Sequence, residues 1–280
     1  MQLFEGKKGL IVGVANNHSI AWAIAEQIMA AGGQCGFTHL PDKPEDDRKK
    51  NQHRVSKLIE GNPNAKFLVP LDVQSNENIA EVMEKTKQEF GEIDFLLHSV
   101  AFASLEDLRV PTVQCSREGF KLAMDISAYS LIALTNAARP ILSKNSSVCA
   151  MTYYGGERIV PGYNMMGVCK AALDSIVKYL AFDLGPDGVR VNAISAGPLK
   201  TLASSAVGAK EMLEMYAAIA PTGDGITHEQ VGKAGSYLLS DMSQGVTAEI
   251  LHVDGGYNQM GSPGRMLDVV KEMKGQLGVK

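Results

Sequence analysis

Short apolar runs alternate with longer segments of helical periodicity along most of the chain. Glycine, proline or polar residues close most of these runs, as is usual where a strand meets a loop. The runs predict strands at Leu10–Gly13, Cys35–His39, Ala65–Val69, Ile93–Leu97, Ser147–Thr152, Val189–Ile194 and Glu249–Val253.

The segments between the runs carry apolar residues at helical spacing. They predict helices over residues 20–28, 45–60, 79–90, 120–142, 163–185, 210–220 and 229–239. A short terminal helix over residues 266–277 is expected to dock on the chain's own core or on a neighbouring subunit.

This alternation favours the α/β class, as a single Rossmann-type, doubly wound parallel sheet of about seven strands with helices on both faces. No repeat, low-complexity tract or linker divides the sequence, so residues 1–280 are expected to form one dinucleotide-binding domain. In such a sheet the ligand binds at the carboxyl ends of the strands.

Composition narrows the range of functions. The formal net charge is −4 and no basic cluster suggests a nucleic-acid partner. The first residues lack the apolar core of a signal peptide, and no apolar run approaches the roughly 20 residues needed to cross a bilayer. Cysteines and histidines are scattered without metal-ligand spacing, so we expect reduced thiols, no metal and a cytoplasmic location.

Two polar residues open the long helix that follows the fifth strand. Tyr163 and Lys170 are seven residues apart. That spacing puts them on one helix face, about 10 Å apart along the axis. An ammonium near a phenol favours the phenolate, so Lys170 is expected to lower the pKa of Tyr163 into a range useful for acid–base chemistry. A pair on a solvated helix face is the plainer interpretation.

The first strand and helix form the unit in which a dinucleotide pyrophosphate would lie, because a helix N-terminus presents free N–H groups. The usual G-x-G-x-x-G is absent, and only Gly13 precedes the loop to Ser19 and Ile20. Ser19 is suited to cap the helix, to touch phosphate, or to do both. An ordinary βα loop remains the alternative.

Three other loops end strands of the predicted sheet. Asp72 suits an adenine amino group as an acceptor, and Val73 and Val100 suit the faces of that ring. A turn-forming aspartate and two core valines are the plainer interpretation. Gly197-Pro198 follows the sixth strand, where a nicotinamide ring can lie against backbone or where a plain loop can pass.

In combination these residues resemble the short-chain dehydrogenase/reductase superfamily and, more narrowly, bacterial enoyl-[acyl-carrier-protein] reductases of the Tyr-x6-Lys type. The six-residue gap is the specific feature, because ordinary members use Tyr-x3-Lys and Gly167 occupies that shorter spacing here. The matching stretches span nearly the whole chain: residues 13–20, 98–103, Tyr153 with Tyr163 and Lys170, 189–201 and 252–256.

The resemblance implies hydride transfer from NADH or NADPH to the β-carbon of a trans-2-enoyl thioester on acyl carrier protein, in fatty-acid synthesis. Tyr163 would stabilise or protonate the enolate oxygen, Lys170 would hold the nicotinamide ribose, and Tyr153 would be a second phenol. Ala103 would touch the substrate through its backbone. The implied cofactor contacts are Gly13, Ser19, Ile20, Leu40, Asp72, Val73, Val100, Lys170, Leu199, Lys200, Thr201, Leu202 and Ala203.

The end of the second strand departs from the family pattern. NADH-using members commonly have glutamine where Leu40 stands, and NADPH-using members tend to have basic residues nearby. Asp42 can accept from ribose hydroxyls, the usual device favouring NAD, whereas Lys43 and Arg48 can pair with a 2′-phosphate. NADH is the expected cofactor, with NADPH as the alternative.

The resemblance also implies a closed homotetramer and a mobile flap over the acyl chain at residues 201–220. The flap's apolar, adaptable surface would come from Met212, Leu213, Met215, Tyr216 and Ile219. The extension after Gly261 is longer than the family pattern predicts. Two other functions stay open: a carbonyl reductase on the same fold, and a dinucleotide-binding regulator without turnover.

Overall fold

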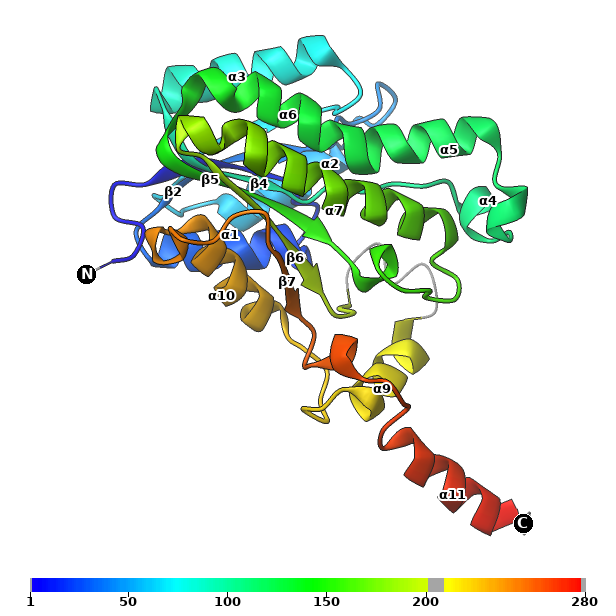
Figure 1. Cartoon of the computed structure of the whole chain (residues 1–280). Helices are drawn as coiled ribbons and strands as arrows, with labels where there is room; N and C mark the ends of the chain where they lie inside the picture. The colour runs from blue at the N-terminus through cyan, green and yellow to red at the C-terminus, as the bar shows by residue number, and fades with distance from the viewer. Residues whose placement is uncertain (1, 201–208, 278–280) are drawn as a thin grey trace.

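The computed structural model describes residues 2–200 and 209–277. Seven strands form one sheet in the order β3-β2-β1-β4-β5-β6-β7, and every neighbouring pair is parallel (Figure 1). The strands are β1 (Lys8–Val12), β2 (Gln34–His39), β3 (Ala65–Pro70), β4 (Ile93–His98), β5 (Leu142–Thr152), β6 (Arg190–Ala196) and β7 (Ile250–Val253). The predicted parallel α/β sheet is confirmed.

Helices cover both faces of this sheet, as Figure 1 shows. One layer is formed by α3 (Asn76–Phe90), α6 (Ser130–Ala138) and α7 (Asn164–Leu184), and the other by α1 (Ile20–Ala30), α2 (Lys50–Ile59) and α10 (His228–Leu239). The strand order changes direction at β1, which puts the carboxyl ends of β1 and β4 beside each other at the switch point where ligands bind in such sheets.

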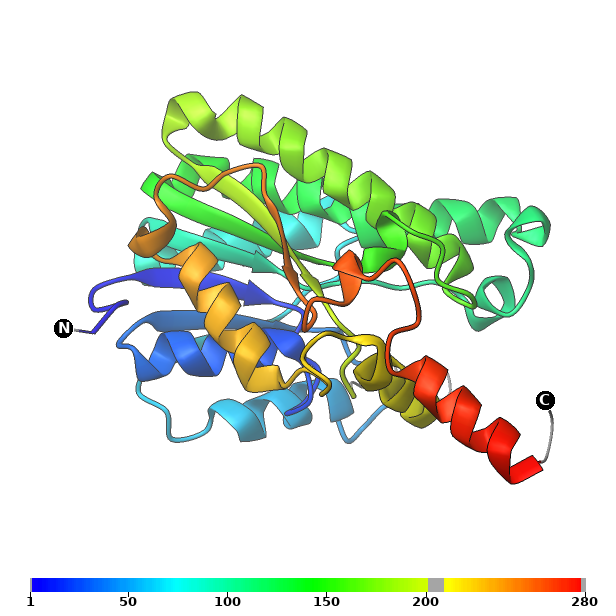
Figure 2. The ribbon, with the colours of Figure 1, turned by 60° about the horizontal axis from the view of Figure 1, so that its bottom comes forward.

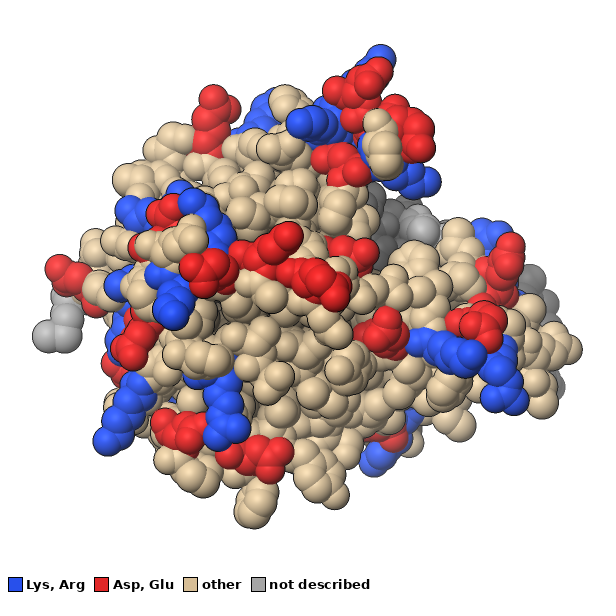
Figure 3. Space-filling view, turned by 90° about the horizontal axis from the view of Figure 1, so that it is seen from above, with Lys and Arg blue, Asp and Glu red and all other residues tan. Residues whose placement is uncertain are grey.

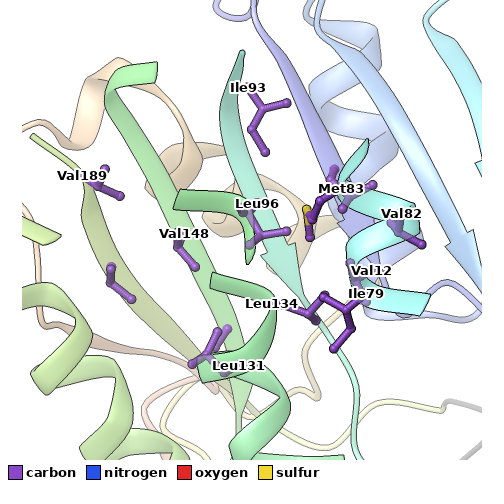
Figure 4. Close-up of a cluster of buried hydrophobic side chains, with 14 of the residues drawn as sticks. Val12, Ile79, Val82, Met83, Ile93, Leu96, Leu131, Leu134, Val148 and Val189 are labelled. Carbon is purple, nitrogen blue, oxygen red and sulfur yellow. The ribbon is translucent and has the colours of Figure 1, made fainter. Parts of the chain in front are cut away.

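Two hydrophobic cores lie on opposite faces of the sheet. Alternate residues of each strand pack into one or the other, because successive side chains of a strand point to opposite faces. Val12 and Leu96 face the α3 and α6 side, together with Leu131, while Ile11 and Leu97 face the α1 and α10 side. Figure 4 shows the first of these cores, in which Ile79, Val82 and Met83 of α3 meet Leu131 and Leu134 of α6.

Two predicted helices have different limits in the structure. The helix expected over residues 45–60 begins only at Lys50, because Lys49 adopts the left-handed conformation (φ 43°), which a right-handed helix does not continue. A residue well before the helix in the sequence caps its first amides. The Asp42 carboxylate accepts hydrogen bonds from Asn51 N at 2.6 Å and Gln52 N at 3.0 Å.

The helix predicted over residues 120–142 is interrupted. It consists of α5 (Arg117–Met124), a π-helical turn (Asp125–Tyr129), α6 and a 3₁₀ turn (Arg139–Ile141) before β5 begins. The extra residue of a π turn rotates the following side chains. It brings the Ser127 hydroxyl to the backbone of Phe102 and the Ser130 hydroxyl to within 2.7 Å of His98 Nε2. The interruption therefore places two serine hydroxyls against the loop and strand at the carboxyl edge of the sheet.

The chain after β6 leaves the layered body. Helix α9 (Ala209–Ile219) lies beside the segment that follows β7, and α11 (Met266–Leu277) extends away from the sheet (Figures 1 and 2). The predicted terminal helix is confirmed. The first alternative for its docking, the chain's own core, is not found: Leu267, Val270 and Met273 are exposed, and α11 contacts α9 outside the layered body. Docking on a neighbouring subunit stays a prediction.

Within the described residues, no helix combines the length and the apolar character that crossing a membrane requires. A four-residue helix, α4 (Leu105–Leu108), completes the elements near the carboxyl edge.

Candidate active site

The structure brings Tyr153, Tyr163 and Lys170 together at the carboxyl end of β5. Tyr153 directly follows β5, and its ring meets the ring of Tyr163 edge-on, with centroids 4.8 Å apart and planes at 71°. Lys170 is 5% exposed, and its Nζ donates to Met151 O at 2.8 Å. The two phenols are therefore partly buried and in contact with each other, and the Lys170 ammonium is buried at the same end of β5, so none of the three lies on a solvated helix face.

Residues next to the pair fix its position. Tyr163 is the residue immediately before α7, and Asn164 begins the helix with φ 37°. The Asn164 side-chain amide donates to Leu108 O at 2.9 Å and to Val110 O at 2.7 Å. These bonds tie the start of α7 to the loop after α4 and so hold the Tyr163 backbone.

Gly167 explains why the shorter Tyr-x3-Lys spacing is absent. A Cβ at this position would stand 2.7 Å from Gly155 O, which is closer than real side chains approach a backbone oxygen. A lysine at position 167 would therefore displace the turn Tyr154–Gly156 that follows Tyr153. The longer spacing places the ammonium one helical turn further on, at Lys170.

The expected lowering of the Tyr163 pKa is not found. Burial raises the pKa of Tyr163, and the neighbouring Tyr153 raises it further, because both make the negatively charged phenolate less favourable. Burial also raises the pKa of Tyr153 to about 12. The ammonium of Lys170 is directed at Met151 O. Tyr163 is therefore a neutral hydrogen-bond donor at ordinary pH and is not a ready phenolate base.

Burial lowers the pKa of Lys170 to about 8, although Asp174 and Cys169 act in the opposite direction. His98, also buried near Lys170, has a pKa lowered to about 3 and stays neutral. Lys170 can donate three hydrogen bonds only in its protonated, ammonium form.

The activity should depend on pH through Lys170. Because Lys170 is protonated below about pH 8, kcat/KM for the reduced cofactor should be constant from pH 6 to 7 and fall as pH rises through about 8. Initial rates measured from pH 6 to 10 test this. Circular dichroism at each pH controls for unfolding. A flat profile up to pH 10 with the fold intact would contradict the assigned role of the ammonium.

Ala103 is buried in a small cluster with Ala123, Met165 and Cys169, against which Tyr163 packs. The loop that carries Ala103 is held by Ser127, whose hydroxyl accepts from Phe102 N at 2.8 Å and donates to Phe102 O at 2.9 Å. The structure therefore brings Ala103 and Tyr163 into one cluster, and the substrate contact of Ala103 stays a prediction.

Gly13 joins the loops after β1 and β4. Its φ is +108°, and a Cβ would stand 2.0 Å from Ser99 O, so only glycine fits. Ser19 occupies the N-cap position of α1 as predicted, but its hydroxyl makes no capping bond. It accepts instead from Ala15 N at 2.9 Å and Asn16 N at 3.1 Å, which folds the loop between Gly13 and Ile20.

The other predicted cofactor residues lie along the same edge. Asp72 closes a turn by accepting from Gln74 N at 3.0 Å, Val73 is buried, and Val100 is partly buried. Leu199 is buried and Lys200 is exposed. Thr201, Leu202 and Ala203, with the rest of 201–208, lie outside the described residues.

The residues after β2 are those expected to distinguish NADH from NADPH. Leu40 is 68% exposed, and Lys43 and Arg48 are exposed as well. The Asp42 carboxylate already caps α2 through Asn51 and Gln52, so it is not a free acceptor for ribose hydroxyls.

A tyrosine cluster next to the site was missed by sequence reasoning. Tyr216 of α9 stacks on Tyr257 with centroids 4.1 Å apart, and Tyr257 meets Tyr154 edge-on at 5.9 Å. Tyr154 also faces His252, whose Nε2 lies 2.7 Å from Glu157 Oε1. The available signals were the Tyr153-Tyr154 doublet and the tyrosine in the apolar stripe of the predicted flap. Nothing in the sequence indicated that these segments meet.

These residues fit a nicotinamide dinucleotide. Met151 O takes one of the three donors that the Lys170 ammonium carries, which leaves two directed at the same edge for hydroxyl groups. Gly13 lets the loop after β1 pack against the backbone of Ser99, so both loops lie at the edge where a dinucleotide would bind. In residues 2–200 and 209–277, no three His, Cys, Asp or Glu side chains gather where they could hold a metal ion. The fold and the site define a reductase of the short-chain dehydrogenase/reductase class.

Comparisons with known proteins identify the family. The model of the enoyl-(acyl carrier protein) reductase family matches residues 13–258. The enoyl-[acyl-carrier-protein] reductase [NADH] FabI of a Nostoc species is 44% identical over 257 residues, which are 91% of this chain and 98% of the relative. The protein of the same name from Aquifex aeolicus is 42% identical over 277 residues, 98% of this chain and 100% of the relative.

Solved structures agree with this result. The crystal structure of the Aquifex aeolicus enoyl-[acyl-carrier-protein] reductase (NADH) has a TM-score of 0.87 at 42% identity, covering 93% of this chain and 99% of that one. The Bacillus cereus enoyl-acyl carrier protein reductase with NADP+ and indole naphthyridinone has a TM-score of 0.88 at 41% identity, covering 94% and 100%. The chain belongs to the enoyl-(acyl carrier protein) reductase family.

Proposed function

We propose that this chain reduces the trans-2 double bond of enoyl thioesters carried on acyl carrier protein, in fatty-acid synthesis. The observation that carries the proposal is the contact of the partly buried phenols of Tyr153 and Tyr163 at the carboxyl end of β5, where the buried Lys170 ammonium is also held. Ala103 belongs to the small apolar cluster against which Tyr163 packs, and an acyl group would be bound there.

The residues have distinct roles in this proposal. When bound, the reduced nicotinamide supplies the hydride. Negative charge then develops on the thioester oxygen, and the neutral Tyr163 phenol is suited to donate a hydrogen bond or its proton to that oxygen. Lys170 would hold the ribose hydroxyls with its remaining donors, and Tyr153 packs against Tyr163 and restricts its ring.

The raised pKa of Tyr163 favours the neutral phenol, because burial disfavours the phenolate. A neutral phenol suits proton donation during reduction of either an enoyl thioester or a carbonyl. It does not suit oxidation of an alcohol, which needs a phenolate base, so the ketone arm of the assay decides between the two substrates.

NADH is the proposed cofactor. Several relatives carry NADH in their names, whereas one solved relative was crystallised with NADP+. Lys43 and Arg48 are exposed, so in the described residues the end of β2 holds no buried cation for a 2′-phosphate. The Asp42 carboxylate is bonded to the first turn of α2 and gives no separate argument for NADH.

One assay tests both proposals. The protein is incubated with crotonyl thioester and either NADH or NADPH, and oxidation of the reduced cofactor is followed by absorbance. A parallel arm replaces the thioester by a ketone. Oxidation of NADH with the thioester is expected. If neither cofactor is oxidised at high enzyme concentration, or if the ketone turns over faster, the proposed function fails.

A homotetramer in the cytoplasm is also proposed. On α7, Tyr179 and Phe182 are 71% and 81% exposed, and Phe120 and Tyr129 are exposed on the neighbouring segment. Figure 3 shows a broad area without charged side chains on the face seen from above. Contiguous exposed apolar surface usually marks an interface between subunits.

Replacing Phe182 by arginine should reduce the assembly to half its mass, because a charge in an apolar interface is not compensated. Light scattering coupled to size exclusion measures the mass. Val113→Arg is the control, because Val113 is 91% exposed but lies outside α7. A Phe182→Arg protein with the wild-type mass would exclude this face from the interface.

Residues 1–280 are proposed to form one domain. Helix α9 is proposed to belong to a flap over the acyl chain. The described part of the flap, α9, places the buried Tyr216 beside Gly197 at the end of β6. Residues 201–208 of that flap lie outside the described residues.

A further inference from the structure

We propose that the segment after β7, residues 254–265, positions helix α9 beside the active site, with Tyr216, Tyr257 and Arg265 as positioning residues for binding of the acyl thioester. This inference rests on the proposed reductase function, because it assigns α9 to the substrate side of the site. It follows from three separate contacts that join α9 to this segment.

The first contact is the stack of Tyr216 on Tyr257. The rings are nearly parallel, at 14°, with centroids 4.1 Å apart. Tyr216 is 4% exposed, although it belongs to a helix that lies outside the main layers. Offset stacks of this kind favour one relative position of the two segments.

The second contact involves the backbone of the turn itself. The Tyr216 hydroxyl donates to Asp254 O at 3.3 Å. The buried Asp254 carboxylate accepts from Gly256 N and Asn258 N, each at 2.9 Å, and so fixes the turn that presents both Asp254 O and Tyr257. The acceptor and the stacking ring are thus held together before α9 meets them.

The third contact lies at the end of α9. Arg265 donates from Nη1 to Ala220 O at 2.9 Å and from Nη2 to Pro221 O at 3.0 Å. Helix C-terminal carbonyls are partly negative and lack partners within the helix, so a guanidinium is a favourable cap. Its planar fork suits two carbonyl groups better than a lysine would.

The consequence for the site comes through Gly197. The Tyr216 hydroxyl lies 2.7 Å from where a Cβ of Gly197 would stand, so α9 packs directly on the loop after β6. Tyr216 belongs to the segment predicted as the flap over the acyl chain. A shift of α9 should therefore change the wall that faces the acyl group.

The test compares Tyr257→Ala, Tyr257→Phe and Arg265→Ala in the full-length protein. Tyr257→Ala should raise KM for crotonyl thioester about two- to tenfold, the range expected for loss of an aromatic pair. The kcat and the KM for NADH should stay within twofold, and Tyr257→Phe, which keeps the stack, should restore the wild-type KM. Arg265→Ala should also raise the thioester KM.

Amide hydrogen exchange provides a second readout that does not depend on turnover. Residues 213–219 of α9 should exchange faster in Tyr257→Ala and Arg265→Ala, while α10 exchanges as in the wild type. Lys271→Ala is the matched control, because Lys271 is exposed on α11 and pairs only with Asp268 among the described residues.

Two results would overturn the inference. One is unchanged exchange in α9 in both variants, which would remove the positioning role. The other is a thioester KM equal to that of Lys271→Ala despite faster exchange in α9. If the wild-type protein reduces no enoyl thioester, the proposed function fails, and the exchange experiment still decides whether residues 254–265 position α9.

Discussion

Replacing Tyr163 by phenylalanine should lower kcat for enoyl thioester reduction by about 10²–10³-fold, the usual effect of removing one donor to a developing oxyanion. The substitution deletes only a hydroxyl. The ring still packs edge-on against Tyr153 and in the cluster with Met165, so the fold should be retained. The KM for NADH should change little, because Lys170 keeps its own bond to Met151 O.

Tyr179→Phe is a matched control for this prediction. It makes the same chemical change within α7, on the face proposed to join subunits, and phenylalanine keeps the exposed ring there. Steady-state kinetics with crotonyl thioester measure kcat, and thermal unfolding checks that all variants are folded. A Tyr163→Phe enzyme that kept more than a tenth of the wild-type kcat would show that another group stabilises the enolate.

Replacing Lys170 by alanine should lower kcat/KM for NADH by about 10–150-fold, the range for losing hydrogen bonds from a charged group. The ammonium is the buried cation at the carboxyl end of β5. Its removal also leaves Met151 O without its donor and takes one of two nearby cations from the Asp174 carboxylate, Lys178 being the other, so some loss of stability is expected. Lys170→Met, which fills the same volume without charge, separates the loss of packing from the loss of donors.

Lys87→Ala is the control for the lysine variants, because Lys87 lies on α3, away from α7, and is exposed. Binding of NADH measured by fluorescence, together with kcat/KM, distinguishes weakened binding from slower chemistry. Full activity in Lys170→Met would remove the assigned role of the ammonium. The alkaline fall in activity predicted for the wild type should be absent from any residual activity of this variant.

The strands were predictable because each is a local apolar run in a sheet buried on both faces. All seven lie within a few residues of their predicted positions. Two helices were predicted less well. The pattern over residues 45–60 continued past Lys49 and gave no signal for its left-handed backbone. The pattern over residues 120–142 gave no signal for the π turn at Asp125–Tyr129.

Tyr163 and Lys170 could be predicted as a pair because their spacing is visible along the chain. The directions of their pKa shifts could not be predicted, because they depend on how much of each group is buried by distant segments. Spacing alone suggested that Lys170 lowers the pKa of Tyr163, whereas packing against Tyr153 and the loop of Ala103 raises it. Sequence proximity of charges did not predict the effect of burial.

The sequence by itself determined the parallel α/β fold, the order of its elements and the placing of Tyr163 and Lys170 seven residues apart on one helix. These are local features, set by periodicity and by spacing along the chain. Only the tertiary structure decided that Tyr216 meets Tyr257 and that Arg265 caps the end of α9. Such contacts join segments about 40 residues or more apart, and their positions depend on how the whole sheet and its helices pack.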